Sequence, residues 1–298
     1  MLLIRASIRT VKSSGTVLHP HVRIGLRAAR QCGQSLLRTF DRPPASRMGR
    51  RALHEYTLAT NNYLFQNIQE SIRNAYPDHK IAQDPTELPE ESSTTWLLQP
   101  LDGETNFLRS LQNYCAVIGI FEGRILQHSI VYDYLQDEEY YASRDETAMV
   151  NQNRLRVSRI EALSDAVIAY ADCSELRALE DSGMQRVQSA LNDAIKHVRV
   201  CGSMGLDVAQ VARGRIDALV ATVNPQDRVL QCTSLLIKEA GGFLTNIPQQ
   251  VESESIIVAA NPRLNQTITA MIKTHLGSET QRLSRKEGVS ARQGVNRN

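Results

Sequence analysis

Apolar residues recur at helical spacing in two segments near the start of the chain. Residues 20–39 place apolar side chains on one side and arginines on the other, which predicts an amphipathic helix that ends before the Pro-Pro pair at 43–44. Residues 56–75 repeat this pattern and predict a second helix. The polar segment 84–95, rich in Pro, Glu, Ser and Thr, is typical of a loop.

From residue 96 onward the apolar period shortens to that of a strand. Strands are expected at 96–98, 114–121, 125–133, 138–142, 166–170, 216–222 and 255–259, and helices at 180–196, 204–213, 228–240 and 262–275. The first four strands follow one another closely and suit an antiparallel meander. Alternating blocks of helix and sheet predict a layered α+β or α/β protein, and this architecture alone implies no function.

The two ends of the chain differ from its middle. No acidic residue precedes Asp41, while several Arg and Lys residues do, so residues 1–17 are interpreted as a basic N-terminal extension or an organellar transit peptide. Residues 276–298 are polar and aperiodic, and we expect them to be disordered. Residues 18–275 then form the folded domain.

Composition excludes several classes of protein. A chain of 298 residues with 42% hydrophobic content can bury a large core, and a net charge of +2 does not favour a nucleic-acid-binding protein. Five widely spaced cysteines without a C-x-x-C pair indicate reduced thiols rather than a disulfide framework or zinc site. The histidines show no ligand spacing, and no segment reaches the ~20 apolar residues needed to span a bilayer. We expect a soluble cytoplasmic protein.

The segment 96–107 carries the strongest chemical signal. An apolar strand beginning at Trp96 runs into Pro100, and a carboxylate–glycine turn at Asp102 and Gly103 follows. A carboxylate presented at the end of a strand can hold a divalent cation against a phosphate. The segment therefore predicts a metal-dependent phosphate site.

This segment, W-L-L-Q-P-L-D-G-E-T-N-F, resembles the metal-binding signature of the inositol monophosphatase family, and within it the bacterial SuhB type. The resemblance covers residues 18–275. Further landmarks of the family follow in the family's order at 71–79, 130–133, 199–207, 214–217, 239–242 and 259–263. Several landmarks in one order make the resemblance specific.

The resemblance implies an inositol monophosphatase or fructose-bisphosphatase-like phosphatase fold, usually as a homodimer. It also implies Mg²⁺-dependent hydrolysis of inositol or sugar phosphate monoesters by a metal-activated water. Such a reaction uses cations about 3.5–4 Å apart that are bridged by a carboxylate. Carried over position by position, the metal ligands are Asp84, Gln99, Asp102, Asp227 and the main-chain carbonyl of Leu101.

The same resemblance assigns the remaining site residues. The catalytic positions are Asp84, Asp102 and Glu104. The substrate-binding positions are Gly103, Thr105, Gly202 and Ser203. A glycine at a helix start lets backbone N–H groups approach an anion, although Ser203 equally suits an ordinary helix N-cap.

Several positions depart from the family pattern. Gln99 replaces the Asp that bridges the metals, and a neutral amide cannot neutralise two cations. Glu104 replaces the Thr that orients the attacking water, and Asn61 stands where the family has Asp. Asp227 lies farther from Glu239 than the family spacing, so its register as a ligand is open. We therefore expect weakened or lost hydrolysis.

Four further departures add to this pattern. Pro85 replaces a Glu, Glu55 and Ala221 replace acidic family residues, and Gln226 replaces a Trp. At most one weakly held Mg²⁺ is expected, between Asp84, Asp102 and the Leu101 carbonyl. Two hypotheses follow: a phosphatase at full or reduced rate, and a non-catalytic SuhB-like regulatory partner of the transcription antitermination machinery.

Overall fold

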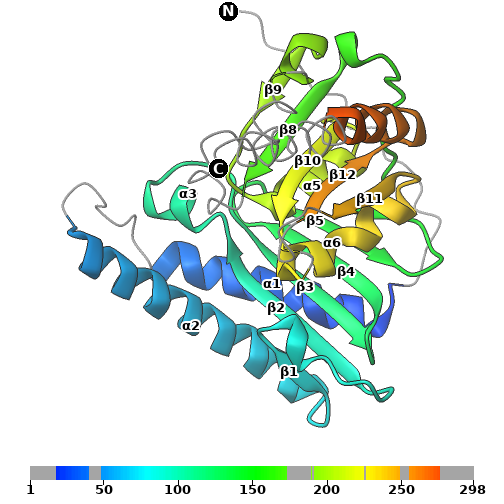
Figure 1. Ribbon diagram of the computed structural model, residues 1–298. Helices are drawn as coiled ribbons and strands as arrows, with labels where there is room; N and C mark the ends of the chain where they lie inside the picture. The colour runs from blue at the N-terminus through cyan, green and yellow to red at the C-terminus, as the bar shows by residue number, and fades with distance from the viewer. Residues whose placement is uncertain are drawn as a thin grey trace, which may run out of the picture.

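The computed structural model describes residues 18–39, 48–172, 189, 191–224, 226–248 and 255–275. Two β-sheets alternate with layers of helices, so the expected layered α/β architecture is confirmed (Figure 1). The expected N-terminal extension, residues 1–17, and tail, residues 276–298, lie outside the described residues.

The first sheet contains the predicted meander. Its seven strands lie in chain order: β1 (Lys80–Ala82), β2 (Thr94–Asp102), β3 (Cys115–Glu122), β4 (Ile125–Asp133), β5 (Glu138–Ser143), β6 (Met149–Val150) and β7 (Asn153–Arg154). β1 is parallel to β2, and the pairs from β2 to β7 are antiparallel. β2 continues beyond the predicted 96–98 to Asp102, with an irregular register between Gln99 and Asp102.

The second sheet is mixed. Its order is β11 (Phe243–Pro248), β12 (Ser255–Ala260), β10 (Ala218–Val223), β8 (Val167–Asp172) and β9 (His197–Arg199). β10 is parallel to β8 and antiparallel to β12. The short strands β1, β6, β7 and β9 and the edge strand β11 were not expected, because none of them carries a clear alternating apolar pattern.

Helices cover both sheets. α1 (Pro20–Thr39) and α2 (Arg50–Ala75) cover the outer face of the first sheet, and α5 (Met204–Ala212) and α6 (Arg228–Glu239) pack between the sheets (Figure 1). The helix at residues 262–275 packs on the outer face of the second sheet. Short helical turns are η2 (Pro85–Glu87), α3 (Glu104–Leu108) and η3 (Leu163–Asp165).

The alternation of side chains along β2 explains why this strand is apolar throughout. Trp96 and Leu98 belong to the cluster under α1 and α2, whereas Leu97 points into the cluster between the sheets. Successive side chains of a strand face opposite sides of the sheet, and both sides are buried here. β2 thus delivers Asp102 at the end of a strand that is fixed on both faces.

The predicted helices agree with the structure where it describes them. α1 matches the prediction. α2 begins at Arg50 rather than 56, and the prediction missed its first turn because that turn is polar and exposed and carries no apolar period. The predicted loop at 84–95 contains η2, and its prediction is wrong for residues 94–95, which begin β2. Of the predicted helix 180–196, residues 180–188 and 190 lie outside the described part, and residues 191–194 are helical.

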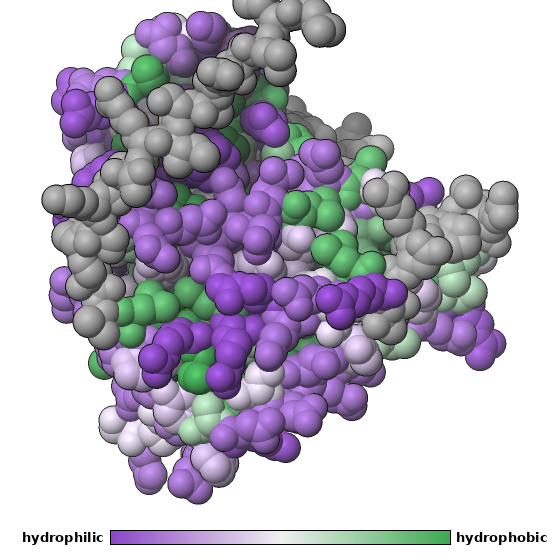
Figure 2. Space-filling view, turned by 180° about the vertical axis from the view of Figure 1, so that it is seen from behind, coloured by the Kyte–Doolittle hydropathy of each residue, from purple (hydrophilic) through white to green (hydrophobic). Residues whose placement is uncertain are grey.

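The surface of the described residues is mainly hydrophilic on the face shown in Figure 2, where hydrophobic side chains form separate small groups. Within the described ranges, every helix is too short or too polar to cross a lipid bilayer.

Candidate functional site

Asp102 is the centre of the candidate site. Its Oδ2 accepts hydrogen bonds from the Ser203 hydroxyl at 2.6 Å and from the Gly205 backbone N–H at 2.8 Å. Ser203 is also the N-cap of α5, accepting from Leu206 N–H. Burial raises the pKa of the Asp102 carboxyl, and the bonds from Ser203 and Gly205 oppose that shift. The fold thus joins the family signature to the start of α5.

Two glycines shape the loops beside Asp102. Gly103 has a φ of +87°, and a Cβ there would lie 2.5 Å from the Asn113 carbonyl oxygen, so only glycine fits this turn. Gly202 has a φ of +76° and lies against Asn106. Asn106 Nδ2 donates to the carbonyls of Cys201 and Asn113, at 2.7 Å each, and so ties the two loops together. The expected substrate-binding residues Gly103, Gly202 and Ser203 are therefore neighbours.

Thr105, the remaining expected substrate-binding residue, is exposed on α3. Glu104 precedes it at the first position of α3, and Glu104 Oε1 accepts a hydrogen bond from Asn61 Nδ2 on α2 at 2.5 Å. Both side chains are partly exposed. Two of the positions that depart from the family pattern are thus direct partners.

The main-chain carbonyl expected to bind metal is already engaged. Gln99 Nε2 donates to the Leu101 carbonyl oxygen at 2.7 Å. The irregular register between Gln99 and Asp102 brings the amide back onto its own strand. An Asp at position 99 offers no donor for this bond.

The Asp84 carboxylate accepts hydrogen bonds from residues next to it in the chain. It is exposed and is the N-cap of η2, accepting from Thr86 N–H at 2.8 Å and the Thr86 hydroxyl at 2.6 Å, while Glu87 completes a capping box. These hydrogen bonds, together with the charge of Arg228, lower the pKa of Asp84.

Asp227 begins α6 as its N-cap, with Oδ1 accepting from Leu230 N–H at 2.9 Å. Burial raises the pKa of Asp227, and the negative charge of Asp227 contributes to the raised pKa of Asp102. The structure therefore places Asp227 in the electrostatic neighbourhood of Asp102.

Arg228 is a cation that the sequence reasoning missed. Its Nη1 donates to the Gln83 carbonyl at 2.6 Å and to the Leu98 carbonyl at 3.3 Å. Its charge helps to lower the pKa of Asp84 and opposes the rise in the pKa of Asp227. A cation in the first turn of a helix is opposed by the helix dipole. An Arg placed directly after an N-cap Asp therefore needs acceptors elsewhere in the fold, and this position in the sequence was the signal that could have identified Arg228.

Asp207 is a buried carboxyl near Asp102, and the sequence reasoning did not identify it as a site residue. It is 1% exposed, and its Oδ2 has no hydrogen-bond partner among the described residues. Burial raises the pKa of Asp207 to about 7, and the charge of Asp102 adds to the shift, while a hydrogen bond with Cys201 and the charge of Arg199 oppose it.

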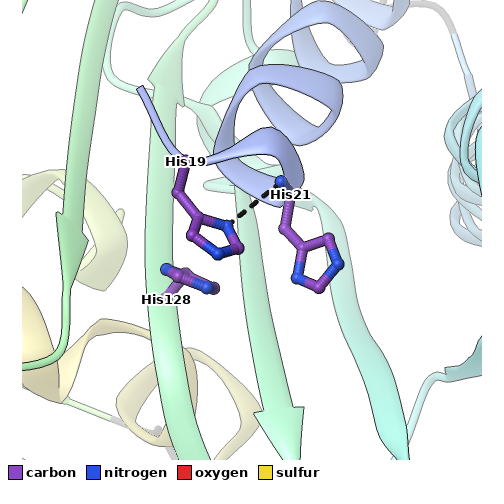
Figure 3. A group of neighbouring side chains, drawn as sticks. All are labelled: His19, His21 and His128. Carbon is purple, nitrogen blue, oxygen red and sulfur yellow. Dashed lines mark hydrogen bonds between the residues drawn. The ribbon is translucent and has the colours of Figure 1, made fainter. Parts of the chain in front are cut away.

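The three expected carboxylate ligands are not gathered into one compact cluster in the structure. Two clamped cations need converging carboxylate oxygens, at least one of them bridging. Across the described ranges, Asp84, Asp102 and Asp227 do not form a group with carboxylate oxygens within 4.8 Å of one another. The group that meets this criterion is instead His19, His21 and His128 (Figure 3), which the fold gathers despite their lack of spacing along the chain.

Comparison with known proteins agrees with the signature residues. Residues 18–276 match the inositol monophosphatase family. Nus factor SuhB of Escherichia coli K12 is 27% identical over 271 residues, which cover 89% of this chain and 100% of that protein. Nus factor SuhB of Pseudomonas aeruginosa is 29% identical over 272 residues, covering 87% and 98%.

Solved structures share the fold. The extragenic suppressor protein suhB from Bartonella henselae superposes with a TM-score of 0.70 at 23% identity, covering 86% of this chain and 100% of that chain. Inositol monophosphatase from Anabaena gives 0.68 at 23%, covering 85% and 95%. The match over residues 18–276, the order of the landmarks and the shared fold lead to one conclusion: the chain belongs to the inositol monophosphatase family.

Proposed function

We propose that this protein is a member of the family that has lost efficient hydrolysis of phosphate monoesters and acts by binding partner proteins. The hydrogen bond from Gln99 Nε2 to the Leu101 carbonyl carries the proposal. Gln99 stands where the family resemblance implies a bridging carboxylate. Its side-chain amide also donates to the main-chain carbonyl that the resemblance implies as a metal ligand. A cation that binds this carbonyl either shares the oxygen with the amide donor or displaces it.

The charge around Arg228 supports the same proposal. A guanidinium is protonated at all physiological pH values and does not leave the site as a metal does. It already offsets the negative charge of Asp84 and Asp227, so the attraction of this region for Mg²⁺ is reduced. Loss of one electrostatic contact to a transition state typically costs ~10²–10³ in rate, and several contacts are altered here.

The test is phosphate release from inositol 1-phosphate, a sugar phosphate and an aryl phosphate, each with and without Mg²⁺. We expect no Mg²⁺-dependent release by the wild-type protein and no heat of Mg²⁺ binding at millimolar concentration in calorimetry. Mg²⁺-dependent release by the wild type that disappears in Asp102→Asn would contradict the proposal, since it would show a working metal site.

Revertants identify which contact limits the activity. The variant Gln99→Asp, Glu104→Thr restores two family residues, and adding Arg228→Ala removes the resident cation. Activity in the double variant would place the loss at Gln99 and Glu104, whereas activity only in the triple variant would place it at Arg228. Asp102→Asn in each background is the matched negative control.

A partner role in transcription antitermination is the second candidate function. The names of the SuhB relatives support it, as do Arg23 and Arg27, which are exposed on α1. We expect purified RNA polymerase with Nus-type factors to bind the immobilised protein, and Arg23→Glu, Arg27→Glu to weaken binding more than the charge-matched control Arg154→Glu, Arg159→Glu. Undetectable binding of the wild type would remove this candidate.

Two further expectations belong to the proposal. A homodimer follows from the resemblance, and light scattering during size-exclusion chromatography measures it directly. A cytoplasmic location is supported by the free thiols of Cys32, Cys115, Cys201 and Cys232, and cell fractionation checks it.

A further inference from the structure

Three histidines meet where α1 begins against the first sheet. His19 precedes α1, His21 lies in its first turn, and His128 lies on β4 (Figure 3). One ring nitrogen from each lies within 4.8 Å of the other two. His19 and His21 retain some solvent exposure, whereas His128 is 8% exposed. The cluster is thus accessible to solvent at His19 and His21 and buried at His128.

The ring of His128 is fixed in a way that suits metal binding. Its Nδ1 lies 2.9 Å from the Ser143 hydroxyl on β5. When Nδ1 donates to that hydroxyl, the lone pair of the neutral ring lies on Nε2. A hydrogen bond to the second ring nitrogen is the usual means by which proteins orient a ligating histidine.

The ring nitrogens lie close enough to meet at one ion if the side chains rotate. The ring centroids of His19 and His128 lie 4.2 Å apart, and those of His19 and His21 lie 4.9 Å apart. His19 Nδ1 accepts a long hydrogen bond of 3.2 Å from the His21 backbone N–H. An ion bound at Nδ1 of His19 replaces this hydrogen bond. An ion bound at Nε2 requires the ring proton to lie on Nδ1, which also breaks the bond, so either mode gives up one weak contact.

A fourth histidine lies nearby but is committed elsewhere. The centroid of His79 lies 5.2 Å from that of His21, and His79 Nδ1 accepts a hydrogen bond from Trp96 Nε1 at 3.0 Å. In the neutral ring the proton then lies on Nε2, so His79 has no free lone pair. The ligand set is therefore three imidazoles.

Burial favours the neutral form of His128 and His21, which is the form that ligates a metal. Burial is the main cause that lowers the pKa of His128, to about 4, and the neighbouring His19 and His21 contribute. Burial likewise lowers the pKa of His21, while Glu122 opposes that shift. Glu122 also places a negative charge near the cluster.

We propose that His19, His21 and His128 bind one divalent transition-metal ion of the Zn²⁺ or Ni²⁺ type, which fastens the start of α1 to β4. Imidazole nitrogens suit these ions and do not suit Mg²⁺, and three histidines with an open position form a known class of zinc site. The site is separate from Asp102, and the proposal does not depend on the proposed function.

The test uses the full chain without a histidine tag, freed of metal by a chelator and titrated with Ni²⁺ in a calorimeter. We expect one ion per chain and binding at least tenfold weaker in His19→Ala and in His21→Ala. His197→Ala, an exposed histidine on β9, is the matched control and should bind as the wild type does. Ni²⁺ should also raise the Tm of the wild type but not that of His19→Ala.

Two measurements keep the proposal open to refutation. His128→Asn removes the buried ligand, and if that variant does not fold, the variants of the partly exposed His19 and His21 decide. Co²⁺ absorption distinguishes imidazole from the free cysteines, because thiolate ligands add a charge-transfer band. Absence of binding, binding unchanged in His19→Ala, or a thiolate band would each overturn the proposal.

Discussion

Asn61 on α2 donates its side-chain N–H to Glu104 on α3, across 2.5 Å. The family resemblance places an acid at position 61 and a hydroxyl at position 104. This chain therefore keeps one acid and one neutral group in the pair, with their positions exchanged. The two substitutions compensate each other, because an acceptor on α3 has gained a donor on α2.

Asn61→Asp should destabilise the protein in a pH-dependent manner. Two facing carboxylates repel each other and raise the folded-state pKa of the pair, so stability is retained below pH ~4 and lost as the pH rises. We expect a loss of about 1–2 kcal/mol at pH 8, limited by the partial exposure of both side chains, and less at pH 4.5. Urea unfolding at the two pH values measures it.

The double variant Asn61→Asp, Glu104→Thr is the internal control. It restores an acid and a hydroxyl, and should recover most of the loss. A double variant as unstable as Asn61→Asp would show that the two residues are not coupled.

Asp207→Asn should flatten the dependence of stability on pH. The raised pKa of about 7 means that folded Asp207 binds more protons than the unfolded chain between pH ~4 and ~7. Its contribution to stability is therefore lost as the pH rises through this range, by at most about 1.4 kcal/mol per pH unit. Urea unfolding at pH 5, 6, 7 and 8 tests this, with the exposed Asp193→Asn as control. Parallel curves for wild type and Asp207→Asn would refute it.

Gly103→Ala should cost more stability than Gly241→Ala. Both glycines have positive φ, +87° and +84°, so both variants incur backbone strain of about 1–2 kcal/mol. Only at Gly103 does the new Cβ also meet backbone, 2.5 Å from the Asn113 oxygen, whereas nothing lies within 4 Å at Gly241. Denaturation midpoints of the two variants separate the strain from the clash. Equal midpoints would mean that the loop at Asn113 moves freely.

Ser203→Ala should destabilise by about 1–2 kcal/mol, because it removes the N-cap of α5 and a donor to the partly buried Asp102. Thr at 203 keeps the hydroxyl and should retain part of that stability. Thermal unfolding of both variants at pH 7 gives the comparison. A wild-type Tm in Ser203→Ala would show that water replaces the hydroxyl at no cost.

The sequence was informative where a pattern is local. The arginine stripe, the apolar period and the Pro-Pro pair at 43–44 were enough to place α1 over 20–39. The bond from Gln99 to Leu101 could not be predicted in the same way, because it depends on an irregular register within β2. Arg228 was missed because its carbonyl partners, at Gln83 and Leu98, lie far from it in sequence.

The histidine cluster shows the limit of spacing arguments most clearly. His19 and His128 are separated by more than a hundred residues, and no interval along the chain marks them as neighbours. They meet because the start of α1 packs against β4 in the assembled core. Long-range packing of this kind follows from the whole fold and from no single segment.

The bond between Gln99 and the Leu101 carbonyl also bears on how an Asp could arise at position 99 during evolution. An Asp introduced alone at position 99 places a carboxylate against a carbonyl oxygen that has lost its donor, so the first step is uphill in stability. Until a cation binds, nothing offsets that cost, and Arg228 still occupies the neighbouring carbonyls. An Asp at position 99 is therefore expected to spread in a lineage only together with a second change that supplies a donor or a cation at the Leu101 carbonyl.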